Sequence, residues 1–66
     1  MPYVNIKITQ ENTTKKQKQE LVFEVTKVLE KVLGKNPKTT FIIIEEIPCD
    51  NWGINNTLVS DNRTCE

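Results

Sequence analysis

The second residue of the chain, Pro2, is the one whose type and position could do chemistry. The initiating methionine is normally removed before a small second residue, and a proline exposed in this way carries a secondary amine. Such an amine accepts protons, and burial among apolar groups lowers its pKa towards the range in which a general base works best. Pro2 therefore is a candidate general base, unless it only favours methionine removal or begins an edge strand.

Other reactive side chains are scarce. The chain has no histidine, which excludes histidine-based triads and Cys/His zinc sites, and its two cysteines alone make a poor metal site. Glu45 and Glu46 are adjacent on a predicted strand, so they point to opposite faces and do not form a matched acid/base pair. We therefore expect neither a metal nor a cofactor.

Three segments with strong periodicity must position Pro2. Residues 3–9 alternate between apolar and polar side chains, which predicts a strand. The run "TKKQ" at 14–17 fits a capping box and predicts a helix of about 19 residues that ends at Gly34. The stretch "TTFIIIEEI" at 39–47 is apolar on both faces in its middle, as interior parallel strands are.

These segments predict an α/β fold, a single β-α-β unit with parallel strands and a right-handed crossover. The loop at 48–57 carries turn formers and Trp52, and Leu58-Val59 is predicted to form a short C-terminal edge strand or hairpin arm. We expect one domain over residues 1–66, in which residues 60–66 form a flexible tail.

The size of the chain indicates an oligomer. A domain of 66 residues buries only about 60% of its unfolded surface, and a two-stranded sheet with one helix is not independently stable. Phe23 also lies off the apolar stripe of the predicted helix, which indicates a second contact surface. Pairing of sheets between subunits, followed by packing of those pairs, would cover the second face of the sheet and Phe23.

Charge and hydropathy exclude several classes of partner. Nine basic residues balance nine acidic residues, which gives no general electrostatic reason to bind nucleic acid or an anionic membrane. The start of the chain lacks the pattern of a signal peptide, and no stretch approaches the roughly 20 apolar residues of a transmembrane helix. We expect a cytoplasmic protein.

Four blocks of sequence together resemble the 4-oxalocrotonate tautomerase family: "PYVNIKIT" at 2–9, "QKQELVFEVTKVLEKVLGKNPKTT" at 17–40, "IIIEEI" at 42–47 and "DNWGI" at 50–54. The resemblance implies the same β-α-β fold, assembled through dimers and commonly as a homohexamer of three dimers, with a dimer as the alternative. It implies an isomerase whose amino-terminal proline moves a proton, converting a small enol or 2-hydroxydienoate acid into its keto tautomer.

The chain departs from this family at two positions. Typical members carry arginines just before the helix and early in the second strand, where this chain has Thr13 and Phe41. Neither residue replaces the bidentate fork of arginine, so the resemblance favours a substrate with one carboxylate. It also implies an apolar wall from Trp52, with Lys7 as the nearest substitute cation and the backbone N–H of Thr9 as a donor to a substrate oxygen.

Several alternatives stay open. Lys7 could be a solvated or interface lysine, Trp52 a hydrophobic anchor between subunits, and a neighbouring subunit could supply Lys38 or Arg63 as the cation. The same proline could protonate or hydrate a haloacrylate-like acid, as a dehalogenase or hydratase does. In a different class of function, the protein would be a non-catalytic oligomeric scaffold or small-acid binder that has lost the arginines.

Overall fold

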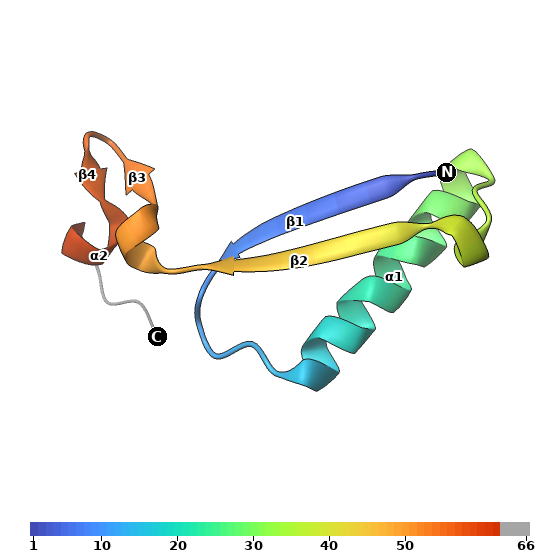
Figure 1. Ribbon diagram of the computed structural model, residues 1–66, viewed down its shortest axis with the longest axis horizontal. Coiled ribbons are helices and arrows are strands. Elements are labelled where there is room, and N and C mark those ends of the chain that lie inside the picture. Colours follow the sequence, from blue (N-terminus) through green and yellow to red (C-terminus); the bar gives the residue numbers. More distant parts are fainter. Residues whose placement is uncertain (63–66) are drawn as a thin grey trace.

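The computed structural model describes residues 1–62 and has two layers, a helix lying across a two-stranded sheet (Figure 1). Strands β1 (Tyr3–Thr9) and β2 (Phe41–Ile47) pair in parallel and are connected through α1 (Lys15–Leu33) and the 3-10 helix η1 (Pro37–Thr39). After β2 come the 3-10 helix η2 (Cys49–Asn51), the antiparallel pair β3 (Gly53–Ile54) and β4 (Thr57–Leu58), and α2 (Val59–Asn62). The predicted β-α-β unit with a short C-terminal hairpin is confirmed.

Local signals set both ends of α1. The hydroxyl of Thr14 accepts the N–H of Gln17 at 3.1 Å, and the side chain of Gln17 accepts the N–H of Thr14 at 2.9 Å, which completes the capping box. At the other end Gly34 has φ of 66°, a left-handed conformation, and its N–H bonds the carbonyl of Glu30 at 2.9 Å. The predicted helix of 19 residues is confirmed.

The register of the parallel pair fixes which side chains share a face. Tyr3 lies opposite Phe41, and this pairing continues to the last residues of both strands. Backbone bonds extend the ladder at each end, since the N–H of Phe41 donates to the carbonyl of Pro2 and that of Gln10 to the carbonyl of Ile47, both at 3.0 Å. Because bonding alternates along a parallel ladder, every second N–H of β1 points to its free edge, those of Tyr3, Asn5, Lys7 and Thr9.

Strand β2 begins two residues later than the sequence predicted for 39–47, at Phe41. The preceding residues form η1 instead of extended chain. Its first position is Pro37, and the side chain of Asn36 accepts the N–H of Lys38 at 2.9 Å, so a capped turn is favoured over a strand.

The hairpin after η2 is closed by a two-residue turn. Asn55 and Asn56 have φ of 53° and 69°, the left-handed pair that such a turn requires and that asparagine tolerates. The predicted arm at 58–59 is partly confirmed, because Leu58 belongs to β4 while Val59 begins α2. Of the predicted tail, residues 60–62 lie in α2 and residues 63–66 lie outside the described part.

One chain covers little of its apolar surface. The molecule is thin, with extents of 42 × 25 × 15 Å, and only Cys49 and Val59 are buried in the described part. Large exposed hydrophobic side chains occur on the outer face of the sheet and along α1, such as Ile43 and Val32. No helix within residues 1–62 is long and apolar enough to cross a lipid bilayer.

Candidate active site

Pro2 stands at the amino end of the sheet, directly before β1. Its carbonyl accepts the N–H of Phe41 at 3.0 Å, so a backbone bond holds the residue against the start of β2. Met1 before it is 86% exposed and is therefore accessible to an aminopeptidase. Loss of Met1 would free the Pro2 nitrogen without removing the bond that positions the residue.

Trp52 is fixed at the carboxyl end of the sheet. Its indole Nε1–H donates to the carbonyl of Ile47 at 3.2 Å, and the same oxygen accepts the N–H of Gln10 at 3.0 Å. The carbonyl of Trp52 in turn accepts the N–H of Val59 at 2.9 Å. These bonds tie the half-buried indole to β2, to the end of β1 and to α2.

Pro2 and Trp52 are far apart within one chain. Both strands run in the same direction, so the residue before β1 and the segment after β2 lie at opposite ends of the sheet (Figure 1). Each strand has seven residues and therefore spans about 23 Å. Trp52 of the same chain cannot form a wall beside Pro2, and the predicted role requires Trp52 from another copy.

Lys7 lies midway along the outer face of the sheet and is bound to a carboxylate. Its Nζ is 2.5 Å from Glu45 Oε1, and the side chain of Asn5 donates to the same oxygen at 2.8 Å. The hydrogen bond from Lys7, followed by that from Asn5, lowers the pKa of Glu45 below its ordinary value. In one chain the charge of Lys7 is thus engaged by Glu45.

Thr9 is the last residue of β1 and lies at the carboxyl end of the sheet, as Trp52 does. Its hydroxyl donates to the carboxylate of Glu11, while the alternation of the ladder directs its backbone N–H to the free edge. The two positions at which typical members of the resembled family carry arginine also lie at opposite ends of the sheet. Thr13 lies between β1 and α1 near the carboxyl end, and Phe41 starts β2 beside Pro2.

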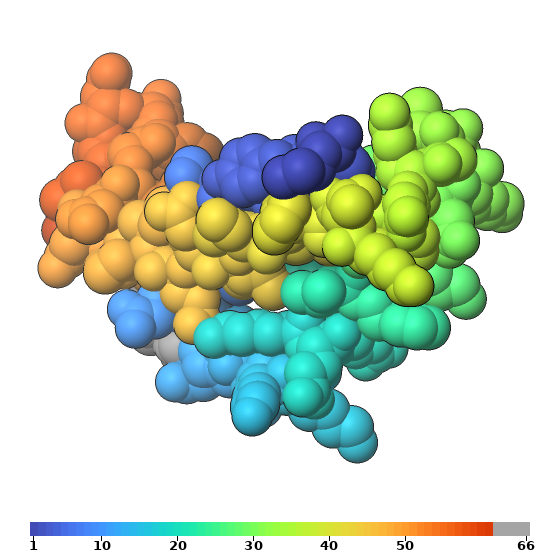
Figure 2. All heavy atoms as spheres, turned by 45° about the vertical axis from the view of Figure 1, so that its right-hand side comes forward, coloured from blue at the N-terminus to red at the C-terminus, as the bar shows by residue number. Residues whose placement is uncertain are grey.

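The amino end carries residues whose proximity the sequence analysis did not identify. Tyr3 and Phe41 are register partners on the outer face, with 61% and 53% of their surfaces exposed, and Lys38 lies nearby in η1. Figure 2 shows the first residues, in dark blue, lying along the yellow residues of β2. The signal that would have found this pair is the register, because Tyr3 is adjacent to Pro2 in the chain and faces Phe41.

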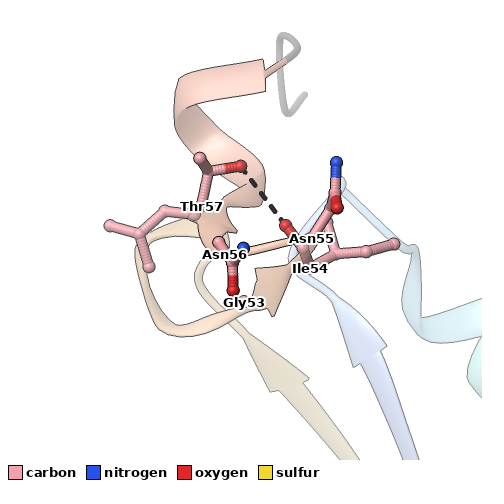
Figure 3. Close-up of a pocket in the computed structure, with 6 residues that line it drawn as sticks. Gly53, Ile54, Asn55, Asn56 and Thr57 are labelled. Atoms are coloured by element: carbon pink, nitrogen blue, oxygen red, sulfur yellow. Dashed lines mark hydrogen bonds between the residues drawn. The ribbon is translucent and has the colours of Figure 1, made fainter.

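A hollow of about 300 Å³ lies at the hairpin, within residues 53–58 (Figure 3). Across it the hydroxyl of Thr57 donates to the carbonyl of Ile54 at 3.2 Å. Its lining offers amides, a hydroxyl and apolar groups but no group that titrates near neutral pH, so it is a poor place for acid–base chemistry. Among the described residues there is also no cluster of three or more side chains suited to hold a metal ion.

Known proteins resemble this chain in sequence and in fold. Residues 2–62 match the tautomerase enzyme family. The chain is 49% identical over 63 residues to "Probable tautomerase K2" of Dickeya dadantii, an alignment that covers 96% of this chain and 94% of that protein. The crystal structure of DmpI from Helicobacter pylori superposes with a TM-score of 0.85 at 36% identity, covering 92% of this chain and 94% of that one.

A heterohexameric 4-oxalocrotonate tautomerase from Chloroflexus aurantiacus shares the fold at a TM-score of 0.83 and 21% identity, with 96% of this chain and all of that one covered. At that identity the likeness concerns the fold alone. The family match spans nearly the whole chain and begins at the proline itself. The chain belongs to the tautomerase family, with the fold of the 4-oxalocrotonate tautomerases.

Proposed function

We propose that the protein is a tautomerase that converts small enol or 2-hydroxydienoate acids to their keto forms by proton transfer through Pro2. The observation that carries the proposal is the position of Pro2, held by its carbonyl at the accessible amino end of the sheet behind an exposed Met1. Membership of the tautomerase family supports it.

The reaction needs only a proton carrier and groups that stabilise an enolate. After removal of Met1, the neutral nitrogen of Pro2 takes the proton of the enol hydroxyl. The C–O bond becomes a carbonyl, and Pro2 returns the proton to the carbon at the far end of the conjugated double bond. The electron pair of that double bond forms the new C–H bond. Between the removal and the return of the proton, negative charge develops on the enol oxygen. Hydrogen-bond donors or a cation beside that oxygen would stabilise this charge.

We further propose that the site is shared between two copies of the chain. A two-fold arrangement with antiparallel sheets would bring the carboxyl end of one chain to the amino end of the other. Trp52 of the second copy would then form the apolar wall beside Pro2 of the first copy. The backbone N–H of Thr9 of the second copy, which points to the free edge of its sheet, would face the enol oxygen. Within residues 1–62 both edges of the β1–β2 sheet are unpaired, and these edges and the uncovered outer face favour such a homo-oligomer, with a hexamer of three dimers as the expected form.

Of the candidate cations for the substrate carboxylate, Arg63 lies outside the described residues, and the proposal concerns Lys7 and Lys38. Lys7 is ion-paired with Glu45. Lys7 of the second copy can therefore bind the substrate carboxylate only if it gives up Glu45. Lys38 lies in η1 at the same end as Pro2 and has no ion pair among the described residues. A single lysine holds one carboxylate without the bidentate geometry of arginine, in keeping with a monoacid.

The absence of arginine at Thr13 and Phe41 favours a second candidate, a non-catalytic small-acid binder with the same assembly. Ketonisation of phenylenolpyruvate, followed by ultraviolet absorbance, separates the two. The protein is used untagged, with loss of Met1 confirmed by intact mass. A matched form carries two extra residues ahead of Pro2, which keeps every side chain but converts the amine into an amide.

We expect the extended form to lose activity by a factor of about 10² to 10⁴, the usual contribution of a general base. Pro2→Ala, which leaves a primary amine, should fall between the extended form and the native protein. Equal rates for the native and extended forms would remove Pro2 from the mechanism and leave the binder as the better description.

A further inference from the structure

Helix α1 carries more apolar side chains than its own sheet covers. Four of them recur at spacings of four, three and four residues, which is the repeat of a seam between two helices: Leu21, Val25, Val28 and Val32. In one chain Leu21 and Val25 are half-buried, whereas Val28 is 56% and Val32 is 70% exposed. This α1 seam therefore lies at the border of the covered side of the helix, and half of it faces solvent.

Two opposite charges lie beside the α1 seam. Glu24 directly precedes Val25 and Lys31 directly precedes Val32, so both charges lie along the same side of the seam. Both side chains are exposed, and neither belongs to an ion pair within residues 1–62. They are seven residues apart, about 10 Å along the helix, which is too far for them to pair within one chain. A hollow of about 340 Å³ beside the seam is lined by Glu24, Lys27, Val28 and Lys31.

A second copy of α1 in antiparallel orientation complements this surface. When the two seams are in contact, Val25 of one copy lies level with Val28 of the other, and both seams are covered along their length. Glu24 then lies within about 3 Å, measured along the axis, of Lys31 of the second copy, and two-fold symmetry makes the same contact twice. A parallel pair would instead place Glu24 against Glu24 and Lys31 against Lys31. The charges therefore favour the antiparallel orientation.

We propose that the α1 seam is the surface on which one copy of the chain recognises another, and that contacts between Glu24 and Lys31 select a like chain in antiparallel orientation. The inference concerns assembly and goes beyond the proposed function, because it holds whether or not Pro2 is a base. Burial of Val28 and Val32 supplies attraction, which many apolar surfaces could also supply. The two charge contacts supply the selection, since a chain with like charges at these positions is repelled.

Reversal of both charges in one chain tests the selection. The double variant Glu24→Lys with Lys31→Glu keeps the contact and exchanges its signs, so it should have the native mass in light scattering after gel filtration. Native chains labelled with ¹⁵N and unlabelled double-variant chains are then unfolded together, refolded and counted by native mass spectrometry. We expect each chain to pair with its own kind, in about tenfold excess over random pairing.

Single reversals and a matched control complete the experiment. Glu24→Lys alone puts two lysines at each contact and Lys31→Glu alone puts two glutamates there, so each should raise the dissociation constant in sedimentation by about tenfold. An equal mixture of the two should regain the native value. Lys16→Glu with Glu30→Lys, on the opposite side of α1, should pair at random with native chains. Random pairing of native and double-variant chains would overturn the inference, as would a native protein that stays a single chain at micromolar concentration.

Discussion

At the carboxyl end of the sheet, η2, the hairpin and α2 pack around Cys49 and Val59, and four hydrogen bonds involve Ile47 or Trp52. At the amino end, Tyr3 and Phe41 remain exposed beside Pro2. The end that holds the candidate base is thus the end with an open surface, and the end without a base has the fixed, partly buried indole. In the proposed shared site each end would supply what the other lacks, and such a site would require two copies of the chain.

The sharpest way to break this comparison is to inactivate the two ends in separate chains. Trp52→Ala and the form with two extra residues ahead of Pro2 should each reduce activity strongly, by about 10² or more for the loss of the amine. After the two variants are unfolded together and refolded as a mixture, sites that combine native Pro2 with native Trp52 reappear. Random pairing in dimers would restore about a quarter of the native activity, because half of the dimers carry one intact site.

The control for this mixture is each variant refolded alone, which should stay inactive. If the mixture is no more active than the mean of its components, Trp52 of one copy does not serve Pro2 of another, and the shared site is wrong.

A charge on the outer face of the sheet should break the assembly that joins the two ends. Ile43 is 47% exposed in one chain, and Ile43→Asp would place an unpaired carboxylate in the contact between copies, at a cost of about 3–5 kcal/mol. We expect dissociation at micromolar concentration, with loss of helical circular dichroism. Light scattering after gel filtration gives the mass, and Gln19→Asp on the exposed side of α1 is the matched control. A native mass for Ile43→Asp would show that this face is not the interface.

The two glycines compare the backbones of the two ends. Gly34 precedes η1 with φ of 66°, and a Cβ there would meet no atom within 4 Å, so Gly34→Ala should cost about 1 kcal/mol through conformation alone. Gly53 begins the hairpin without a left-handed φ, and its Cβ would lie 3.9 Å from the carbonyl oxygen of Thr57. Gly53→Ala should therefore be neutral or slightly stabilising. Urea unfolding at a fixed protein concentration measures both, and an equal loss would contradict the difference.

The smallest effect concerns the ion pair midway between the ends. Interactions with Lys7 and Asn5 lower the pKa of Glu45 below its ordinary value of 4.5. The folded state is therefore stabilised above that value, and this stabilisation is lost as the pH falls below 4.5 and through the lower pKa of the folded state. Glu45→Gln should make the free energy of unfolding less dependent on pH in this window than it is in the native protein. A pH profile of Glu45→Gln identical to that of the native protein would show that the pair contributes nothing.

Most of the fold was predictable because its signals are local. The capping box at Thr14, the left-handed Gly34 and the alternation of residues 3–9 each act within a few residues, and the structure has all three. The late start of β2 was missed because the cap formed by Asn36 outweighed the strand propensity of the threonines that follow it.

The candidate site was less predictable because it depends on pairing between distant segments. The parallel pairing that the sequence predicted already places Pro2 and Trp52 at opposite ends, but no periodicity shows where a second copy lies. The partner of Lys7 and the neighbour of Tyr3 both follow from the register of β1 against β2. A shift of two residues would preserve every face and change both contacts.

The hydrogen bond that joins the indole of Trp52 to the carbonyl of Ile47 has an optical consequence. Trp52 is the sole tryptophan of the chain, and it is half-buried in a single copy. Its fluorescence therefore reports how much water reaches one defined place, the carboxyl end of the sheet. If a second copy covers that place, the emission maximum should move to longer wavelength on dilution below the dissociation constant, so the chain carries its own label for assembly.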